Sequence, residues 1–291
     1  MNMRFGFLGN SKILKDCSTN KTVSVEVLSK QDDIDKKINR LRKVAKDNIL
    51  NTLKILENNK ALGINVYGLS SKLFPLPNYP DLEYFKYIDS LKNELLELGN
   101  YIKENNFRVN IHLENTIILN SISDKVLQDA IKDIKYQNVL LNYMGLDEKY
   151  KIIINVGGAY RNKVDAMERF YETLTNLPEN LKKRLALKND DNTLSPNFMI
   201  KICNQFSIPF FLNIDDKNID SEAIIKSAKS WEKEDIPALF GLRSNSGIAK
   251  LNGINSADVI LGNPDKDLSV LRFMGKIWLY SIFYFIPNKT Y

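Results

Sequence analysis

Histidine is almost absent from this chain of 291 residues: the only one is His112. Imidazole is a main ligand of transition metals in proteins, so a single histidine excludes a metal centre built from several of them. Any metal site in this chain must therefore rely on carboxylates and amides.

Cysteine is scarce as well, with only Cys17 and Cys203. Two cysteines exclude a disulfide framework and favour a reducing compartment, so we expect a cytoplasmic protein. The first twelve residues carry charge early and contain no long apolar stretch, so no signal peptide is expected. The apolar, aromatic segment Ile277–Ile286 is too short to cross a bilayer, and no membrane partner is expected.

Charge of one sign is not in large excess either. The 41 basic and 35 acidic residues give a formal net charge of +6. This charge permits a polyanionic partner but does not require one.

The chain does contain a regular alternation of short apolar runs with longer amphipathic segments. The predicted strands are Met3–Leu8, Ile64–Leu69, Phe107–His112, Ile152–Val156, Leu185–Leu187, Ile208–Asn213, Ala238–Leu242 and Asp258–Leu261. The predicted helices are Asp33–Asn58, Pro80–Glu104, Asp124–Met144, Lys163–Leu177, Pro196–Gln205, Ser221–Trp231 and Pro264–Lys276, whereas Ser244–Gly253 is weak as a helix.

Eight strands that alternate with helices favour parallel pairing with helices on the sheet faces. The pattern predicts an α/β protein with one domain over residues 1–291, a single (β/α)8 TIM barrel. A doubly wound open sheet is the alternative.

Several blocks of sequence, taken in order, resemble the UV damage endonuclease family. The quoted blocks are Asn58–Pro75 with its paired serines and Leu-Phe-Pro, Arg108–Ser121, Tyr143–Lys163, Leu185–Asp191 and Asp258–Phe273. The resemblance runs from Arg4 to about Phe273. It implies a xylose-isomerase-like barrel and an activity that nicks DNA beside ultraviolet lesions with a cluster of divalent metals.

The departures from the family pattern fall on its metal ligands. Asn155 replaces a family histidine, Lys188 a glutamate and Gly262 a glutamate, and the family's Asp-Ile-His-His becomes a segment that begins at Asn213. In the seventh strand a lysine and a histidine correspond to Leu239 and Gly241. The resemblance implies these vestigial site positions: Tyr79, His112, Asn155, Lys188, Asn213, Asp216, Gly241 and Gly262.

These losses bear directly on metal binding. Amides are weak ligands, glycine offers no side chain, and the Lys188 ammonium repels a divalent cation. A pair of unit charges about 4 Å apart interacts by roughly 4 kcal/mol at an effective dielectric near 20. We therefore expect no metal cofactor. The alternative is Mn or Mg held by the weak candidates His112, Glu114, Asp190 and Asp216.

Two hypotheses concern the charged groups near the strand ends. In one, the Lys188 ammonium takes the place of a metal ion and pairs with one or more of Glu114, Asp190, Asp215 and Asp216. In the other, these acids are solvated loop residues or helix caps. For His112 we predict a structural histidine held by hydrogen bonds rather than a ligand.

The resemblance also implies candidates for ligand binding: Phe7, Ser70, Ser71, Glu114, Asn115, Thr116, Asn189 and Asp190. Asn115 and Thr116 occupy the place of a glutamine and an aromatic that probe damaged bases, and Thr116 cannot stack on a base. As a strand residue, Phe7 is either a probe or part of the core. Turn or capping roles compete with phosphate contacts at Ser70 and Ser71.

Three functions follow as hypotheses. The favoured one is a catalytically inactive pseudoenzyme with a degenerate metal site that binds double-stranded DNA or regulates. The second is an active DNA-repair endonuclease with a metal site rebuilt from carboxylates. The third is a protein-interaction module, with a homodimer formed through the apolar aromatic segment 277–291.

Overall fold

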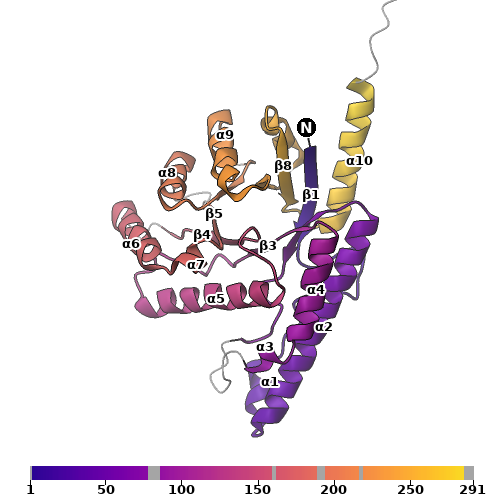
Figure 1. Cartoon of the computed structure of the whole chain (residues 1–291), viewed down its shortest axis with the longest axis vertical. Helices are drawn as coiled ribbons and strands as arrows, with labels where there is room; N and C mark the ends of the chain where they lie inside the picture. Colours follow the sequence, from indigo (N-terminus) through magenta and orange to yellow (C-terminus); the bar gives the residue numbers. More distant parts are fainter. Residues whose placement is uncertain (1, 78–85, 159–161, 189–193, 216–218, 285–291) are drawn as a thin grey trace, which may run out of the picture.

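The computed structural model describes the backbone of most of the chain in five segments (Figure 1). Its side chains are described too, except those of residues 86, 245, 246 and 276–284. The described segments are 2–77, 86–158, 162–188, 194–215 and 219–284.

Eight strands form one closed parallel barrel in the order β1 to β8. The strands are β1 Asn2–Leu8, β2 Val66–Leu69, β3 Arg108–His112, β4 Ile152–Asn155, β5 Leu185–Lys188, β6 Phe210–Asn213, β7 Ala238–Leu242 and β8 Ser256–Leu261. The last strand pairs with the first over the register Asn2↔Ser256 to Gly6↔Ile260. This closure confirms the predicted barrel and shows that the open-sheet alternative is wrong.

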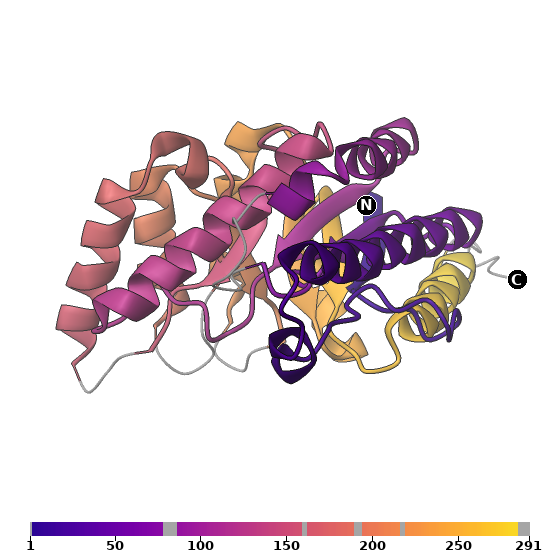
Figure 2. The ribbon, with the colours of Figure 1, turned by 90° about the horizontal axis from the view of Figure 1, so that it is seen from below.

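Helices surround the strands on the outside of the barrel (Figures 1 and 2). They are α1 Val25–Ser29, α2 Ile34–Ala61, α3 Lys86–Asp89, α4 Lys92–Glu104, α5 Asp124–Tyr143, α6 Lys163–Asn176, α7 Glu179–Lys182, α8 Pro196–Phe206, α9 Ser221–Ser230 and α10 Lys266–Tyr284, with the 3-10 helices η1 Glu232–Glu234 and η2 Asn245–Leu251. Two of them, α2 and α9, begin at an acidic cap; the Asp33 carboxylate, for example, accepts from the backbone N–H groups of Asp35 and Lys36.

Two of the predicted helices differ from the observed ones. The predicted helix Pro80–Glu104 is two helices, α3 and α4, and its first six residues lie outside the described residues. The last helix, α10, continues to Tyr284, beyond its predicted end at Lys276. The weak segment after β7 forms the 3-10 helix η2, as expected of a run that begins Ser-Asn-Ser-Gly, all poor helix formers.

The direction of the β1 side chains follows from their contacts. Arg4 binds Asp258 of β8, and Arg108 of β3 lies 4.0 Å from the same carboxylate across the barrel, so these three side chains point inward. Phe5 and Phe7 alternate with Arg4 and face the helices. The Phe5 ring meets Phe273 of α10 at a centroid distance of 5.0 Å.

Phe7 is therefore a core residue, and its candidacy as a ligand-binding residue is wrong. Its side chain has no exposed surface, and its ring packs edge-to-face on Tyr67 at 5.4 Å between centroids. The reason is the two-residue period of a strand, which places Phe7 on the face opposite to the inward-pointing Arg4.

A charged cluster closes the amino-terminal end of the barrel. The Arg4 guanidinium donates to both carboxylate oxygens of Asp258 at 2.7 Å, and the Asp258 side chain is only 1% exposed. Arg108 lies over the ring of Trp231 at 5.1 Å and is buried, and this burial lowers its pKa to about 10. In a β/α barrel this end serves stability rather than chemistry.

The carboxyl ends of the eight strands lie at the opposite end, which we call the mouth. His112, Asn155, Lys188 and Asn213 are the last residues of β3, β4, β5 and β6, and Gly262 directly follows β8. The prediction that these residues converge on one rim is confirmed. Among the described residues, no helix is both long and apolar enough to span a membrane.

Candidate functional site at the barrel mouth

Strand register places the vestigial positions side by side at the mouth. Asn155 of β4 is opposite Lys188 of β5, and Asn213 of β6 is opposite Gly241 of β7. Between these pairs, Lys188 is in register with Phe211. The floor of the mouth therefore includes an amide from β4, an ammonium from β5, and a phenyl ring and a second amide from β6.

His112 occupies the floor from the neighbouring strand β3. Its ring packs edge-to-face on Phe211 with 5.0 Å between centroids. The ring keeps some exposed surface, but its Nε2 atom is buried and has no hydrogen-bond partner in the described part of the chain. The prediction of a hydrogen-bonded histidine is thus wrong for Nε2, because the surroundings of this atom include an apolar ring.

Burial and the Lys188 ammonium together lower the pKa of His112 to about 3. Burial is the larger cause, since it disfavours the charged imidazolium. Lys188 is the only charged group of the described residues that acts on this pKa. His112 is consequently neutral at physiological pH.

Glu114 and Asp215 are the two described acids among the expected partners of Lys188, and both make contacts with other residues. The Glu114 carboxylate pairs with the Lys72 ammonium at 2.6 Å on the rim, where both side chains are about half exposed. Asp215 accepts hydrogen bonds from the backbone N–H of Arg243 and from the N–H and hydroxyl of Ser244. Each acid therefore fixes a loop.

Four of the predicted site residues lie outside the described residues. They are Tyr79, Asn189, Asp190 and Asp216. Their roles stay predictions.

The loop after β3 brings three further candidates to the mouth. The Asn155 side-chain amide donates to the amide oxygen of Asn115, which joins the β3 loop to the end of β4. Glu114, Asn115 and Thr116 are all exposed. Ser70 has a turn role, because its hydroxyl accepts from the backbone N–H of Lys72 at 3.1 Å. Ser71 contributes its carbonyl oxygen to a hydrogen bond from Gln137 at 2.9 Å.

The Asn213 side chain is packed directly against the backbone of Gly241. A Cβ atom placed on Gly241 would lie 2.0 Å from the Asn213 amide oxygen and 3.0 Å from Cζ of Phe211. The Asn213 side chain therefore occupies the space that any side chain at position 241 would need. The two departures from the family pattern form one structural unit, which the sequence did not reveal.

We expect Gly241→Ala to lower the free energy of unfolding by about 1–3 kcal/mol, because the added methyl group overpacks a buried site. In the Asn213→Ala background the same change is expected to be milder, so the double-mutant cycle should show coupling of about 1 kcal/mol or more. Urea denaturation of the four proteins measures this coupling. Additive effects of the two substitutions would contradict the proposed dependence.

Few of the described residues at the mouth could serve as ligands of the metal cluster that the family resemblance implies. His112 Nε2 is a free buried nitrogen of the kind that binds a metal, but its neighbours on the floor are amides and an ammonium. No group of three or more His, Cys, Asp or Glu side chains within the described residues could hold a metal ion. Gly262 adds no ligand, and the position of its missing Cβ lies 3.5 Å from the Cγ atom of Arg243.

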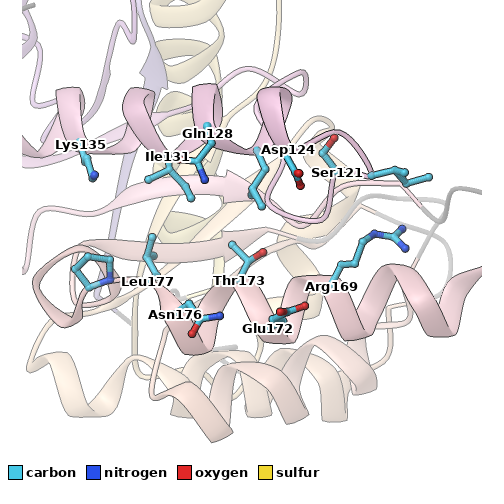
Figure 3. A pocket seen from close by; sticks show the side chains of 13 residues that line it. Ser121, Asp124, Gln128, Ile131, Lys135, Arg169, Glu172, Thr173, Asn176 and Leu177 are labelled. Carbon is cyan, nitrogen blue, oxygen red and sulfur yellow. The ribbon is translucent and has the colours of Figure 1, made fainter.

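Two hollows lie near or beside the mouth. One, of about 640 Å³, is lined on the rim by residues that include Ser71, Lys72, Phe74 and Glu114. The other, of about 440 Å³, is a groove between α5 and α6 that contains none of the vestigial positions. Figure 3 shows Asp124 and Arg169 facing this second groove from opposite helices, near Ser121.

Comparison with known proteins decides the family. The family described as UV-endonuclease UvdE matches residues 3–269. This chain belongs to the UvdE family. The UV DNA damage endonuclease of Bacillus thuringiensis subsp. konkukian (strain 97-27) is 35% identical over 261 residues, which are 88% of this chain and 78% of the relative. That of Bacillus cereus (strain G9842) is 34% identical over 308 residues, with 95% of each chain covered.

Solved structures agree with this membership of the UvdE family. The crystal structure of SacUVDE superposes with a TM-score of 0.84 at 26% identity, over 96% of this chain and 99% of that one. The 3-keto-D-glucoside 4-epimerase YcjR from E. coli has a TM-score of 0.57 at 12% identity, covering 96% and 100%, and shares the fold alone. The predicted TIM barrel, which the resemblance to the UV endonuclease family implied, is thus confirmed.

Proposed function

We propose that this UvdE-family barrel binds double-stranded DNA at its mouth, in a DNA-repair or regulatory role, without assembling a metal cluster and without nicking. One observation carries the proposal: the ammonium of Lys188 lies on the mouth floor, close enough to His112 to lower the pKa of the imidazole. A fixed positive charge at this place attracts the phosphate backbone of DNA and repels divalent cations.

The residues of the mouth can bind a phosphodiester but are poorly suited to cleaving one. Strand scission needs a group that activates water and one that stabilises the leaving oxygen. With a pKa of about 3, His112 is a weak base at neutral pH and carries no proton to give as an imidazolium. Lys188 offers a positive charge, while Asn155 and Asn213 offer neutral amides.

The second candidate is an active endonuclease, and the names of the Bacillus relatives favour it. This reading needs Mn or Mg held by a rebuilt set of acids. Glu114 is paired with Lys72 on the rim, so the site would depend on Asp190 and Asp216. An active enzyme would use the metal ion to generate hydroxide and to stabilise the leaving oxygen.

A metal analysis and a nicking assay together separate these candidates. We expect the purified protein to contain no stoichiometric manganese, magnesium or zinc after dialysis against manganese. It should leave irradiated supercoiled plasmid intact under conditions in which the Bacillus cereus (strain G9842) relative nicks it. It should still retard a duplex in a gel at low salt, with an affinity that falls steeply as salt rises.

Each of these expected results has an opposite outcome that would contradict the proposal. Manganese at full occupancy, or nicking at a rate comparable to that of the relative, would refute the inactive reading. Failure to retard irradiated and undamaged duplex at low salt would remove DNA as the partner.

The third candidate, a protein-interaction module, rests on the segment 277–291. We propose that the chain acts in the cytoplasm, and a homodimer through this segment stays a prediction because its side chains lie outside the described residues. Light scattering over a range of protein concentrations measures the oligomeric state, and a monomer at every concentration would exclude the dimer.

A further inference from the structure

We infer that the amino-terminal end of the barrel binds one small monovalent anion, of the size of chloride, on a free edge of the Arg108 guanidinium. The inference assigns a ligand to the charged cluster that Arg108 forms with Arg4 and Asp258. It does not rest on the proposed function, because the cluster lies at the end of the barrel opposite to the mouth. Its failure would leave that proposal unchanged.

Two nitrogen atoms of Arg108 have no acceptor. The Nε and Nη2 atoms are buried, and neither has a hydrogen-bond partner in the described part of the chain. The carboxylate of Asp258 lies 4.0 Å from Nε, which is too far for a hydrogen bond. Nε and Nη2 lie on the same edge of the guanidinium plane, and such an edge binds an anion through two N–H groups at once. A buried donor without an acceptor is costly, so an anion on this edge stabilises the folded state.

The carboxylates near Arg108 are already bonded to other cations. Both oxygens of Asp258 accept from Arg4 at 2.7 Å, and a carboxylate oxygen of Glu234 lies 2.5 Å from the ammonium of Lys151. Burial is the largest cause of the lowered pKa of Arg108, and Asp258 and Glu234 only partly offset that decrease. Arg108 is thus a third cation beside two described carboxylates, which leaves one positive charge in surplus.

The surroundings of the edge favour a small ion. The Trp231 ring covers one face of the guanidinium, with its centroid 5.1 Å from Cζ, and the Arg108 side chain is only 4% exposed. An ion of atomic size fits beside such a buried group more readily than a large oxyanion does. A single surplus charge is matched by a monovalent ion. The side chain of Arg4 is 30% exposed, so the cluster borders on solvent at this residue.

Anomalous diffraction from crystals grown in sodium bromide tests the site directly. Bromide carries the charge of chloride, is similar in size, and is distinguished from water by its anomalous signal. We expect a bromide peak within hydrogen-bond distance of Nε and Nη2 of Arg108. A water molecule at this edge in place of bromide, or a direct hydrogen bond from the edge to Asp258, would overturn the inference.

Thermal unfolding tests the same site in solution. We expect the midpoint to rise by about 2–4 °C and then to level off as sodium gluconate is replaced by sodium chloride. Gluconate has the charge of chloride but is much larger, so the replacement keeps the ionic strength constant and changes only the size of the anion. A midpoint that is the same in both salts would contradict binding of chloride in solution.

Two variants assign the shift to Arg108. Arg108→Met removes the guanidinium and leaves the pair of Arg4 and Asp258 in place, so chloride should no longer raise the midpoint. Arg272→Met removes an exposed guanidinium that pairs with Asp265, and it should keep the full shift. If Arg108→Met does not fold, the bromide crystal of the wild type still decides. A chloride shift as large in Arg108→Met as in the wild type would refute the site.

Discussion

Replacement of Asp258 by alanine is expected to lower the free energy of unfolding by about 3–5 kcal/mol, because it removes the counter-ion of the buried Arg108 and the partly buried Arg4. Asp258 accepts two hydrogen bonds from the Arg4 guanidinium at 2.7 Å and lies 4.0 Å from Arg108. Burial already lowers the pKa of Arg108 to about 10, which shows how poorly this charge is solvated. Without Asp258, both charges would remain in the closed end of the barrel.

Urea denaturation at pH 7 measures this loss. The matched control is Asp265→Ala, which removes a carboxylate that pairs with Arg272 at 3.0 Å while both side chains are more than half exposed. That change should cost less than about 1 kcal/mol, as exposed ion pairs contribute little. Equal losses in the two variants would show that burial does not increase the contribution of Asp258 to the free energy of unfolding.

Acidification is expected to destabilise the fold through His112, over the range from pH 6.5 down to about 3. The folded-state pKa of His112 is about 3, whereas the ordinary value is 6.5. Below pH 6.5 the unfolded chain binds a proton at this residue that the folded chain does not bind. Stability therefore falls as pH falls, by up to about 1.4 kcal/mol per pH unit from this residue alone.

Denaturation curves at pH 7.5, 6, 5 and 4 for the wild type and His112→Gln measure this contribution. The difference in stability between the two proteins should shift in favour of His112→Gln as the pH is lowered. In Lys188→Gln the pKa of His112 should rise, but it should stay below 6.5 because burial, the larger cause, remains. A pH-independent difference between wild type and His112→Gln would contradict the buried, neutral imidazole.

Membership of the UvdE family is compatible with departures at the ligand positions that the resemblance implies, because fold and chemistry depend on different residues. The barrel is closed by strand pairing and by apolar packing of residues such as Phe5 and Phe7. The chemistry depends on a few positions at strand ends, where Asn155 and Lys188 differ from the family pattern while the register between them is preserved. Side chains at these strand ends can therefore change while the scaffold is preserved.

The amino-acid sequence by itself determined the barrel, because alternating apolar runs and amphipathic helices report the local periodicity of strands and helices. It also located the carboxyl end of each strand to within one residue, and a shared rim follows from parallel pairing. Only the tertiary structure decided the partners of these residues. Glu114 binds Lys72, Asn213 fills the space over Gly241, and His112 Nε2 is buried beside Phe211. Such contacts join segments far apart in the chain, and local periodicity carries no information about side-chain distances across a closed sheet.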